Sequence, residues 1–124
     1  MNSIFGSLFI VSTPLGNLKD ITLRALNIMK NSYLIAAEDT RKSKILLKEY
    51  DIKTKMISYH EHNSHNRIKT IISYLKDGKN ISLISDAGTP GISDPSYRLI
   101  RSAIENEITC LLYTSDAADD EERG

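Results

Sequence analysis

The polar residues that could carry chemistry follow four short apolar runs of the sequence. These segments are residues 13–17 (TPLGN), 38–41 (EDTR), 60–63 (HEHN) and 86–91 (DAGTPG). The connections on the other side of the runs, such as residues 77–80, are short and plain. If the runs are parallel strands, their carboxyl ends meet at one edge of the sheet, where ligands of such folds bind. The asymmetry predicts a functional site at that edge.

The segment of residues 85–95 (SDAGTPGISDP) has the composition of a ligand-binding loop. Gly88 and Gly91 lack a Cβ, so the backbone can reach positive φ and approach a ligand closely. Asp86 could accept hydrogen bonds from ribose or amine groups, and exposed N–H groups could receive a carboxylate. The alternative is a tight strand-to-helix turn that uses glycine and proline for geometry alone. The first loop, TPLGN, lacks both the G-x-G-x-x-G spacing and a Walker lysine.

Paired carboxylates, Glu38 and Asp39, close the second apolar run, with Thr40 and Arg41 directly after them. Carboxylates at the end of a buried strand favour ligand binding or proton handling. The alternative is structural: Asp39 and Thr40 cap a helix, and a carboxylate pairs with Arg41.

A histidine-rich segment follows the third run and invites a metal-site interpretation. It contains His60, Glu61, His62 and His65. Their spacing matches no zinc signature and no thiolate lies nearby, so the sequence predicts no metal. His60 or His62 is expected to be a polar residue of the groove.

The net charge of zero conceals two segments of opposite charge. Ile, Lys and Asn fill 35 of the first 109 positions and none of the last 15, which carry five acids and one base. Residues 1–109 therefore hold 15 bases and 11 acids. Their lysines at 42, 44, 48, 53 and 55 are either a solvated helix face or a patch that faces RNA.

The composition break predicts that residues 110–124 are a non-native tail; the alternative is an acidic disordered tail. The string CLLYTSDAADDE also resembles translated read-through of a transposon sequencing adapter. On the first interpretation, the native sequence stops at about Thr109.

Four apolar runs predict strands, and the patterns between them predict helices. The strands are expected at residues 8–12, 33–37, 56–59 and 81–85. Four helices are expected. The first runs from about Asp20, its N-cap, to Lys30, and the second follows Thr40. The third covers residues 68–75 with Gly78 just past its end, and the fourth begins at Pro95. Their inward faces are expected to include Ile21, Ala25, Ile28, Met29, Ile45, Leu46, Leu47, Ile68, Ile71, Ile72, Leu75, Leu99, Ile100, Ala103 and Ile104.

Alternating strands and helices predict one α/β domain whose largely parallel sheet of four to five strands is flanked by helices. A fifth strand is expected near Ile108, where the composition breaks, so the sheet is expected to lack an element. One cysteine excludes an internal disulfide. No signal peptide is recognisable, and no apolar run reaches the ~20 residues of a membrane span, so a soluble cytoplasmic protein is expected.

Four segments in register resemble one known family. They are residues 11–26 (VSTPLGNLKDITLRAL), 34–41 (LIAAEDTR), 57–63 (ISYHEHN) and 85–100 (SDAGTPGISDPSYRLI). The match covers residues 8–108 in order, and it resembles the tetrapyrrole methylase superfamily, in particular the branch that methylates ribosomal RNA.

The resemblance implies a bacterial cytoplasmic homodimer. It implies that the protein uses S-adenosyl-L-methionine to methylate the 2′ oxygen of a cytidine ribose in 16S ribosomal RNA. It also implies site residues: Pro14, Leu15, Gly16, Asp86, Ala87, Gly88, Thr89 and Pro90 at the donor, and Glu38, Asp39, Thr40 and Arg41 at the RNA or the reacting ribose.

Members of the family are considerably longer than this chain and continue into a second domain. Residues 1–109 are therefore expected to be an incomplete N-terminal donor-binding domain that is inactive by itself. Glu38, Asp39 and His60 are the candidates for accepting the hydroxyl proton, in that order. The alternatives are a small-molecule tetrapyrrole methylase of the same superfamily and a non-catalytic nucleotide-binding module.

Overall fold

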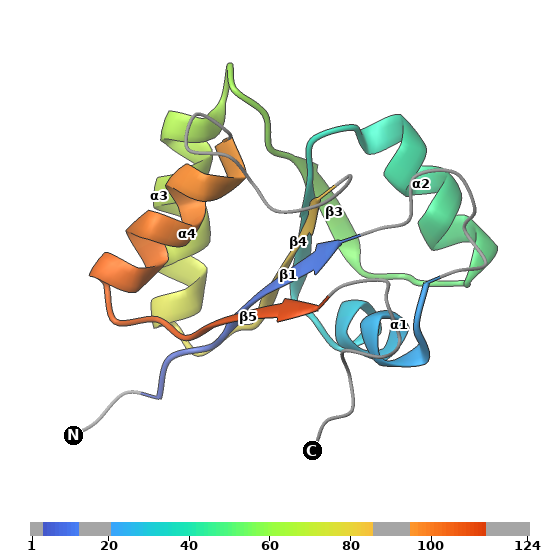
Figure 1. Cartoon of the computed structure of the whole chain (residues 1–124), viewed down its shortest axis with the longest axis horizontal. Helices are drawn as coiled ribbons and strands as arrows, with labels where there is room; N and C mark the ends of the chain where they lie inside the picture. The colour runs from blue at the N-terminus through green and yellow to red at the C-terminus, as the bar shows by residue number, and fades with distance from the viewer. Residues whose placement is uncertain (1–3, 13–20, 86–94, 114–124) are drawn as a thin grey trace.

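A sheet of five parallel strands lies between two pairs of helices in the computed structural model, which describes residues 4–12, 21–85 and 95–113 (Figure 1). The elements are β1 (Leu8–Ser12), α1 (Leu23–Lys30), β2 (Leu34–Ala37), α2 (Thr40–Glu49), β3 (Lys55–Ser58), α3 (Ser64–Lys76), β4 (Ile81–Ser85), α4 (Pro95–Glu105) and β5 (Cys110–Tyr113). The predicted α/β fold with a parallel sheet is confirmed. None of these helices has the length and apolarity that a membrane span requires.

The strand order β3-β2-β4-β1-β5 determines which helices share a face of the sheet. The connections through α1 and α2 both run toward β3, whereas those through α3 and α4 run back toward β5. Because crossovers between parallel strands are right-handed, helices that travel in opposite directions cover opposite faces. Accordingly α1 and α2 lie on one side of the sheet and α3 and α4 on the other (Figure 1).

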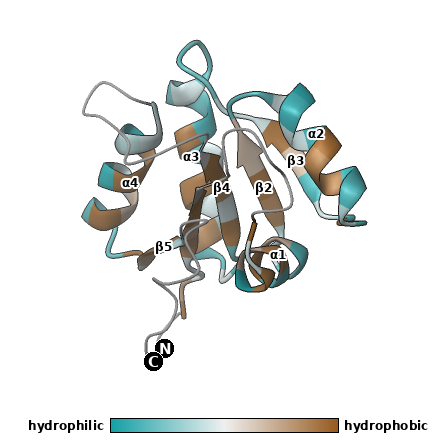
Figure 2. Ribbon diagram, turned by 45° about the vertical axis from the view of Figure 1, so that its right-hand side comes forward, coloured by the Kyte–Doolittle hydropathy of each residue, from teal (hydrophilic) through white to brown (hydrophobic). Residues whose placement is uncertain are grey.

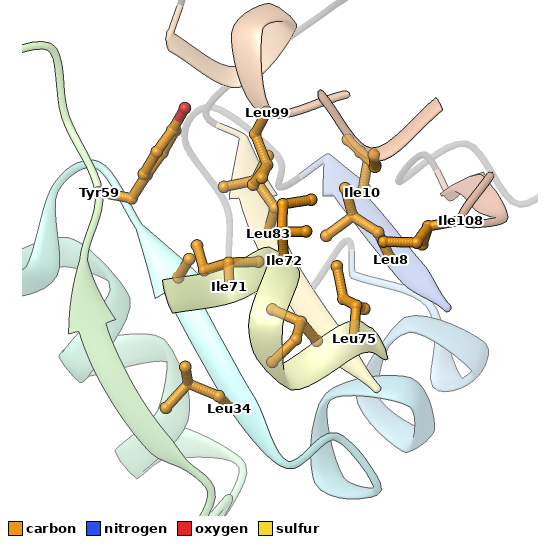
Figure 3. Packing of buried hydrophobic residues seen from close by; sticks show 13 residues of the cluster. Leu8, Ile10, Leu34, Tyr59, Ile71, Ile72, Leu75, Leu83, Leu99 and Ile108 are labelled. Carbon is orange, nitrogen blue, oxygen red and sulfur yellow. The ribbon is translucent and has the colours of Figure 1, made fainter. Parts of the chain in front are cut away.

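Two hydrophobic clusters fill the two sides of the sheet, because successive strand side chains point to opposite faces. Leu8, Ile10 and Leu83 pack with α3 and α4 (Figure 3), whereas Val11 and Ile35 pack with α1 and α2. Burial on both faces explains why the strands read as continuous apolar runs and not as alternating ones. Figure 2 shows the same distribution, with hydrophobic strands inside and hydrophilic residues on the outer sides of the helices.

The fifth strand is present, so the expectation of a missing element was wrong. β5 pairs in parallel with β1, and Leu8 N also donates to Thr109 O at 2.9 Å. The pairing uses backbone N–H and C=O groups, which every residue except proline supplies, and the apolar residues 110–112 (CLL) suit a strand. Burial raises the pKa of the Cys110 thiol. The sheet therefore continues past the composition break at residue 110, where β5 begins.

The helix starts and faces correct three details of the sequence analysis. Thr22, and not Asp20, is the N-cap of α1, because its hydroxyl accepts from Ala25 N at 3.1 Å. Ile45 and Ile104 were expected to face inward but are 60% and 58% exposed. Both are next to buried residues in the sequence, but the 100° step between successive helical residues turns their side chains away from the sheet. The other predicted apolar positions are buried or packed against the core.

Three helices end with a residue in the left-handed conformation, and only one of these residues is glycine. Gly78 has φ +93°, as the sequence predicted for the end of α3, but Asp51 and Glu107 hold the same place after α2 and α4 with φ 55° and 63°. In each case the following amide closes a six-residue turn onto the helix. These bonds are Ile52 N to Leu47 O (2.8 Å), Lys79 N to Tyr74 O (3.1 Å) and Ile108 N to Ala103 O (2.9 Å).

Candidate active site at the carboxyl edge of the sheet

The four strands that precede the polar segments end at one edge of the sheet. Ser12 of β1 is level with Ser85 of β4, and Ala37 of β2 is level with Ile84 and with Ser58 of β3. The structure therefore confirms that the strands before the four polar segments end at a common edge. Neighbouring strands here lead to helices on opposite faces, which is the arrangement that opens a ligand crevice.

An open hollow of about 480 Å³ lies at this edge and is lined by Glu38, Asp39, Thr40, Arg41 and His60. A hydrogen bond from Tyr59 N to Ala37 O (2.8 Å) continues the pairing of β2 and β3 beyond the strands. This bond places His60 beside the residues that follow Ala37. The structure thus brings together all five of the catalytic and substrate-binding candidates that the sequence analysis placed in the described residues.

Asp39 has a structural role at the start of α2. Its Oδ1 accepts from Arg41 N at 3.1 Å and from Lys42 N at 3.2 Å, which caps the helix. The capping alternative that the sequence left open is confirmed for Asp39. Glu38 is exposed beside it.

His60 is held by Asn63, the residue directly before α3, whose side chain forms no capping hydrogen bond with the helix. The backbone N–H of His60 donates to Asn63 Oδ1 at 2.9 Å, and this contact orients the amide. Asn63 Nδ2 then faces Ser58 Oγ at 3.0 Å and His60 Nε2 at 3.4 Å. The other imidazole nitrogen, Nδ1, is buried and has no hydrogen-bond partner among the described residues. Nδ1 of His60 is therefore closed to bulk solvent, and Nε2 faces Asn63.

Two further residues shape this edge and were not singled out by the sequence analysis. Arg67 Nε on α3 donates to Ser58 O at 2.8 Å, so α3 is attached to the end of β3. The hydroxyl of the buried Tyr59 donates to Pro95 O, the first residue of α4. The His-x-x-Asn spacing of a turn could have indicated Asn63, but no local pattern predicts contacts such as that of Arg67, nine residues from its partner.

The expected donor-binding residues lie outside the described ranges. They are Pro14, Leu15, Gly16, Asp86, Ala87, Gly88, Thr89 and Pro90. Their segments leave from Ser12 and Ser85, which are neighbours across β1 and β4. Over the ranges that are described, no three His, Cys, Asp or Glu side chains are grouped as metal ligands would be.

The hollow combines an exposed carboxylate, an arginine and an oriented imidazole. Such a set can bind a polar sugar and accept a proton from a hydroxyl.

Comparison with known protein families identifies the family of this chain. Residues 7–112 match the family model of the tetrapyrrole (corrin/porphyrin) methylases. The chain belongs to this family. The match extends through Leu112 and therefore includes most of β5.

Curated relatives of this tetrapyrrole methylase chain are named ribosomal RNA small subunit methyltransferase I. The protein of Halalkalibacterium halodurans is 51% identical over 106 residues, covering 86% of this chain and 37% of the relative. That of Streptococcus pyogenes is 48% identical, covering 91% and 39%, and that of Thermotoga maritima is 50% identical, covering 83% and 48%. The chain thus spans less than half the length of these relatives.

Solved structures share the fold at low sequence identity. Uroporphyrin-III-C-methyltransferase from Thermus thermophilus aligns with a TM-score of 0.66 and 12% identity, over 88% of this chain and 47% of that one. A putative cobalamin synthesis related protein from Corynebacterium diphtheriae aligns with a TM-score of 0.63 and 12% identity, over 90% and 52%. At this identity the likeness describes the fold alone.

Proposed function

We propose that this chain is the N-terminal part of a longer enzyme that transfers a methyl group from S-adenosyl-L-methionine to the 2′ oxygen of a cytidine ribose in 16S ribosomal RNA. The observation that carries the proposal is the hollow of Glu38, Arg41 and His60 at the same edge of the sheet from which both expected donor loops depart. The names of relatives that are about 50% identical support the same reaction.

We place the donor at the carboxyl ends of β1 and β4. These neighbouring strands lead to helices on opposite faces, and a crevice at such a point can receive a nucleoside-sized ligand. Residues 14–16 and 86–90 follow these two strands and would hold the donor. When bound, the donor supplies an electrophilic methyl group attached to a cationic sulfur.

Glu38 is the residue that we assign to the proton of the ribose hydroxyl. Its exposed side chain lines the hollow, whereas Asp39 caps α2 and the nitrogens of His60 face the protein. As the 2′ oxygen forms its bond to the methyl carbon and the carbon–sulfur bond breaks, the carboxylate would take the hydroxyl proton. Arg41 and Thr40 would bind the nucleotide, and the His60 ring would form part of the wall of the hollow.

Glu38→Gln in the full-length protein tests this assignment. The amide keeps the size of the side chain but cannot accept the proton, so kcat should fall by about 10² to 10⁴ while donor affinity stays unchanged. The assay is transfer of labelled methyl groups to small ribosomal subunits that lack the modification. Glu49→Gln, the same change at an exposed position at the end of α2, is the control. Turnover of Glu38→Gln within threefold of the wild type would remove Glu38 from the mechanism.

Methylation of a tetrapyrrole or similar small molecule is the second candidate, and the low-identity structural neighbours motivate it. Incubating the full-length protein with labelled donor and either ribosomal subunits or a porphyrin separates the two reactions. Label on the porphyrin alone would overturn the RNA assignment, and donor binding without transfer to either would indicate a nucleotide-binding module.

The remaining proposals concern the whole protein. We propose that it acts in the cytoplasm as a homodimer, that residues 1–109 are native, and that residues 110–124 are a non-native tail of which the first four complete the sheet. Sequencing genomic DNA beyond the codon for Thr109 tests the boundary, since a native continuation should encode a different fifth strand.

A further inference from the structure

The outer face of α2 carries a stripe of basic side chains with one exposed isoleucine at its edge. The buried residues of this helix are Ser43, Leu46 and Leu47. At 100° per residue, Arg41, Lys44, Ile45 and Lys48 lie on the opposite side of the helix within about 100° of one another. We call these four residues the α2 stripe. All four are exposed.

The basic side chains of the α2 stripe form no salt bridge with the described residues. In the part of the chain that the structure describes, no acidic side chain forms a salt bridge with Arg41, Lys44 or Lys48. Lys53 differs, because its Nζ is 2.9 Å from Asp51 Oδ1. Of the lysines that the sequence analysis grouped as a patch, Lys44 and Lys48 are therefore open to a partner, whereas Lys53 is already paired with Asp51.

The stripe begins in the candidate active site. Arg41 lines the hollow and is also the first residue of the stripe, and Lys48 lies seven residues, or about 10 Å, further along the helix axis. A ligand bound in the hollow that continues along α2 must therefore be elongated and negatively charged. A nucleic acid strand meets both requirements, with its sugar at Glu38 and its phosphates along the lysines.

We propose that the α2 stripe is the surface on which the phosphates next to the target nucleotide of the RNA lie. The proposal rests on the proposed function, because it uses the hollow as the place of the ribose. Lys44 and Lys48 neutralise phosphates, and Ile45 beside them contacts a sugar or base. Such contacts position the RNA without reading its sequence.

The double variant Lys44→Ala/Lys48→Ala in the full-length protein tests the proposal. Its affinity for small ribosomal subunits that lack the modification is measured over a range of salt concentrations. Two lost phosphate contacts should reduce the slope of log K against log salt by about 1.4 for single-stranded and about 1.8 for duplex RNA. If the curves of variant and wild type converge near 1 M salt, affinity at about 0.1 M should fall by about 25- to 60-fold.

Lys69→Ala/Lys76→Ala is the matched control, because it removes the same charge from exposed positions of α3 on the opposite face of the sheet. Its slope should equal that of the wild type. Ile45→Ala should weaken binding but keep the slope, since it removes no charge. The KM of Lys44→Ala/Lys48→Ala for ribosomal subunits should rise with little change in kcat.

Failure of this proposal can be told apart from failure of the proposed function. If the wild type methylates ribosomal RNA and both double variants bind it with the same slope, the stripe is not the RNA surface although the function stands. If only binding to vesicles of anionic phospholipid depends on Lys44 and Lys48, the partner is a membrane surface and the proposal is overturned. If the wild type neither binds nor methylates RNA, the function itself is wrong.

Discussion

Replacing Tyr59 with phenylalanine removes one hydroxyl group and leaves the buried ring in place. That hydroxyl donates to Pro95 O, and so connects the residue before His60 with the first turn of α4. The expected donor-binding segment is residues 86–90, and four residues separate it from Pro95. We therefore expect Tyr59→Phe to loosen the attachment of this segment as well as to destabilise the fold.

The hydroxyl of Tyr59, a residue that is 1% exposed, donates to the part-buried carbonyl of Pro95. A partly buried acceptor that loses its donor costs about 1–3 kcal/mol, and the ring packing against the core is retained. The free energy of unfolding should fall by this amount. Because a factor of ten in affinity corresponds to about 1.4 kcal/mol, donor affinity should fall by at most about 5- to 150-fold.

Calorimetric titration of the full-length protein with S-adenosyl-L-methionine measures the change in donor affinity, and denaturant unfolding measures the change in stability. Tyr74→Phe is the control, because Tyr74 is a half-buried tyrosine near the carboxyl end of α3, in ring contact with Tyr33 at 5.1 Å. It should leave donor affinity unchanged. A Tyr59→Phe protein that is less stable but binds the donor as tightly as the wild type would refute the inferred connection between β3 and the donor segment.

Two predictions concern backbone geometry. Glu107→Gly should raise the free energy of unfolding by about 1 kcal/mol. Glu107 has φ 63°, and this left-handed conformation costs a residue with a side chain about 1–2 kcal/mol, which the greater backbone entropy of glycine in the unfolded chain partly offsets. A lower melting temperature would contradict this. Gly6→Ala should destabilise the protein by at least about 1–3 kcal/mol, because a Cβ at Gly6 would lie 1.9 Å from Lys79 O, a backbone atom that cannot turn away. Unchanged denaturant unfolding of Gly6→Ala would show that the two segments are not in contact.

The strands and most helix faces could be predicted from the sequence because their signals are local. β1 and β4 have the predicted bounds, and the bounds of β2 and β3 differ from the prediction by one residue. Ile45 and Ile104 were misassigned because an apolar residue beside a buried row looks the same in sequence as one within it. The left-handed helix ends at Asp51 and Glu107 were missed because neither residue type signals that conformation as glycine does.

The candidate site was predictable in its position and not in the roles of its residues. Glu38 and His60 could be expected at the same edge, because parallel strands align their carboxyl ends. The sequence left Asp39 open between cap and catalyst, and only its contacts with two amides of α2 show that it is the cap. The separation of Lys44 and Lys48 from Lys53 likewise depends on which acids lie nearby.

The sequence by itself determined the α/β class, the edge at which the polar segments gather and the family to which the chain belongs, because each follows from short-range pattern and residue identity. The tertiary structure decided the strand order, the faces of the helices and the contacts of His60, Tyr59 and Asp39. Strand order depends on which apolar surfaces pack together across long separations in the chain. Hydrogen-bond partners become definite only when that packing has fixed the distances between side chains.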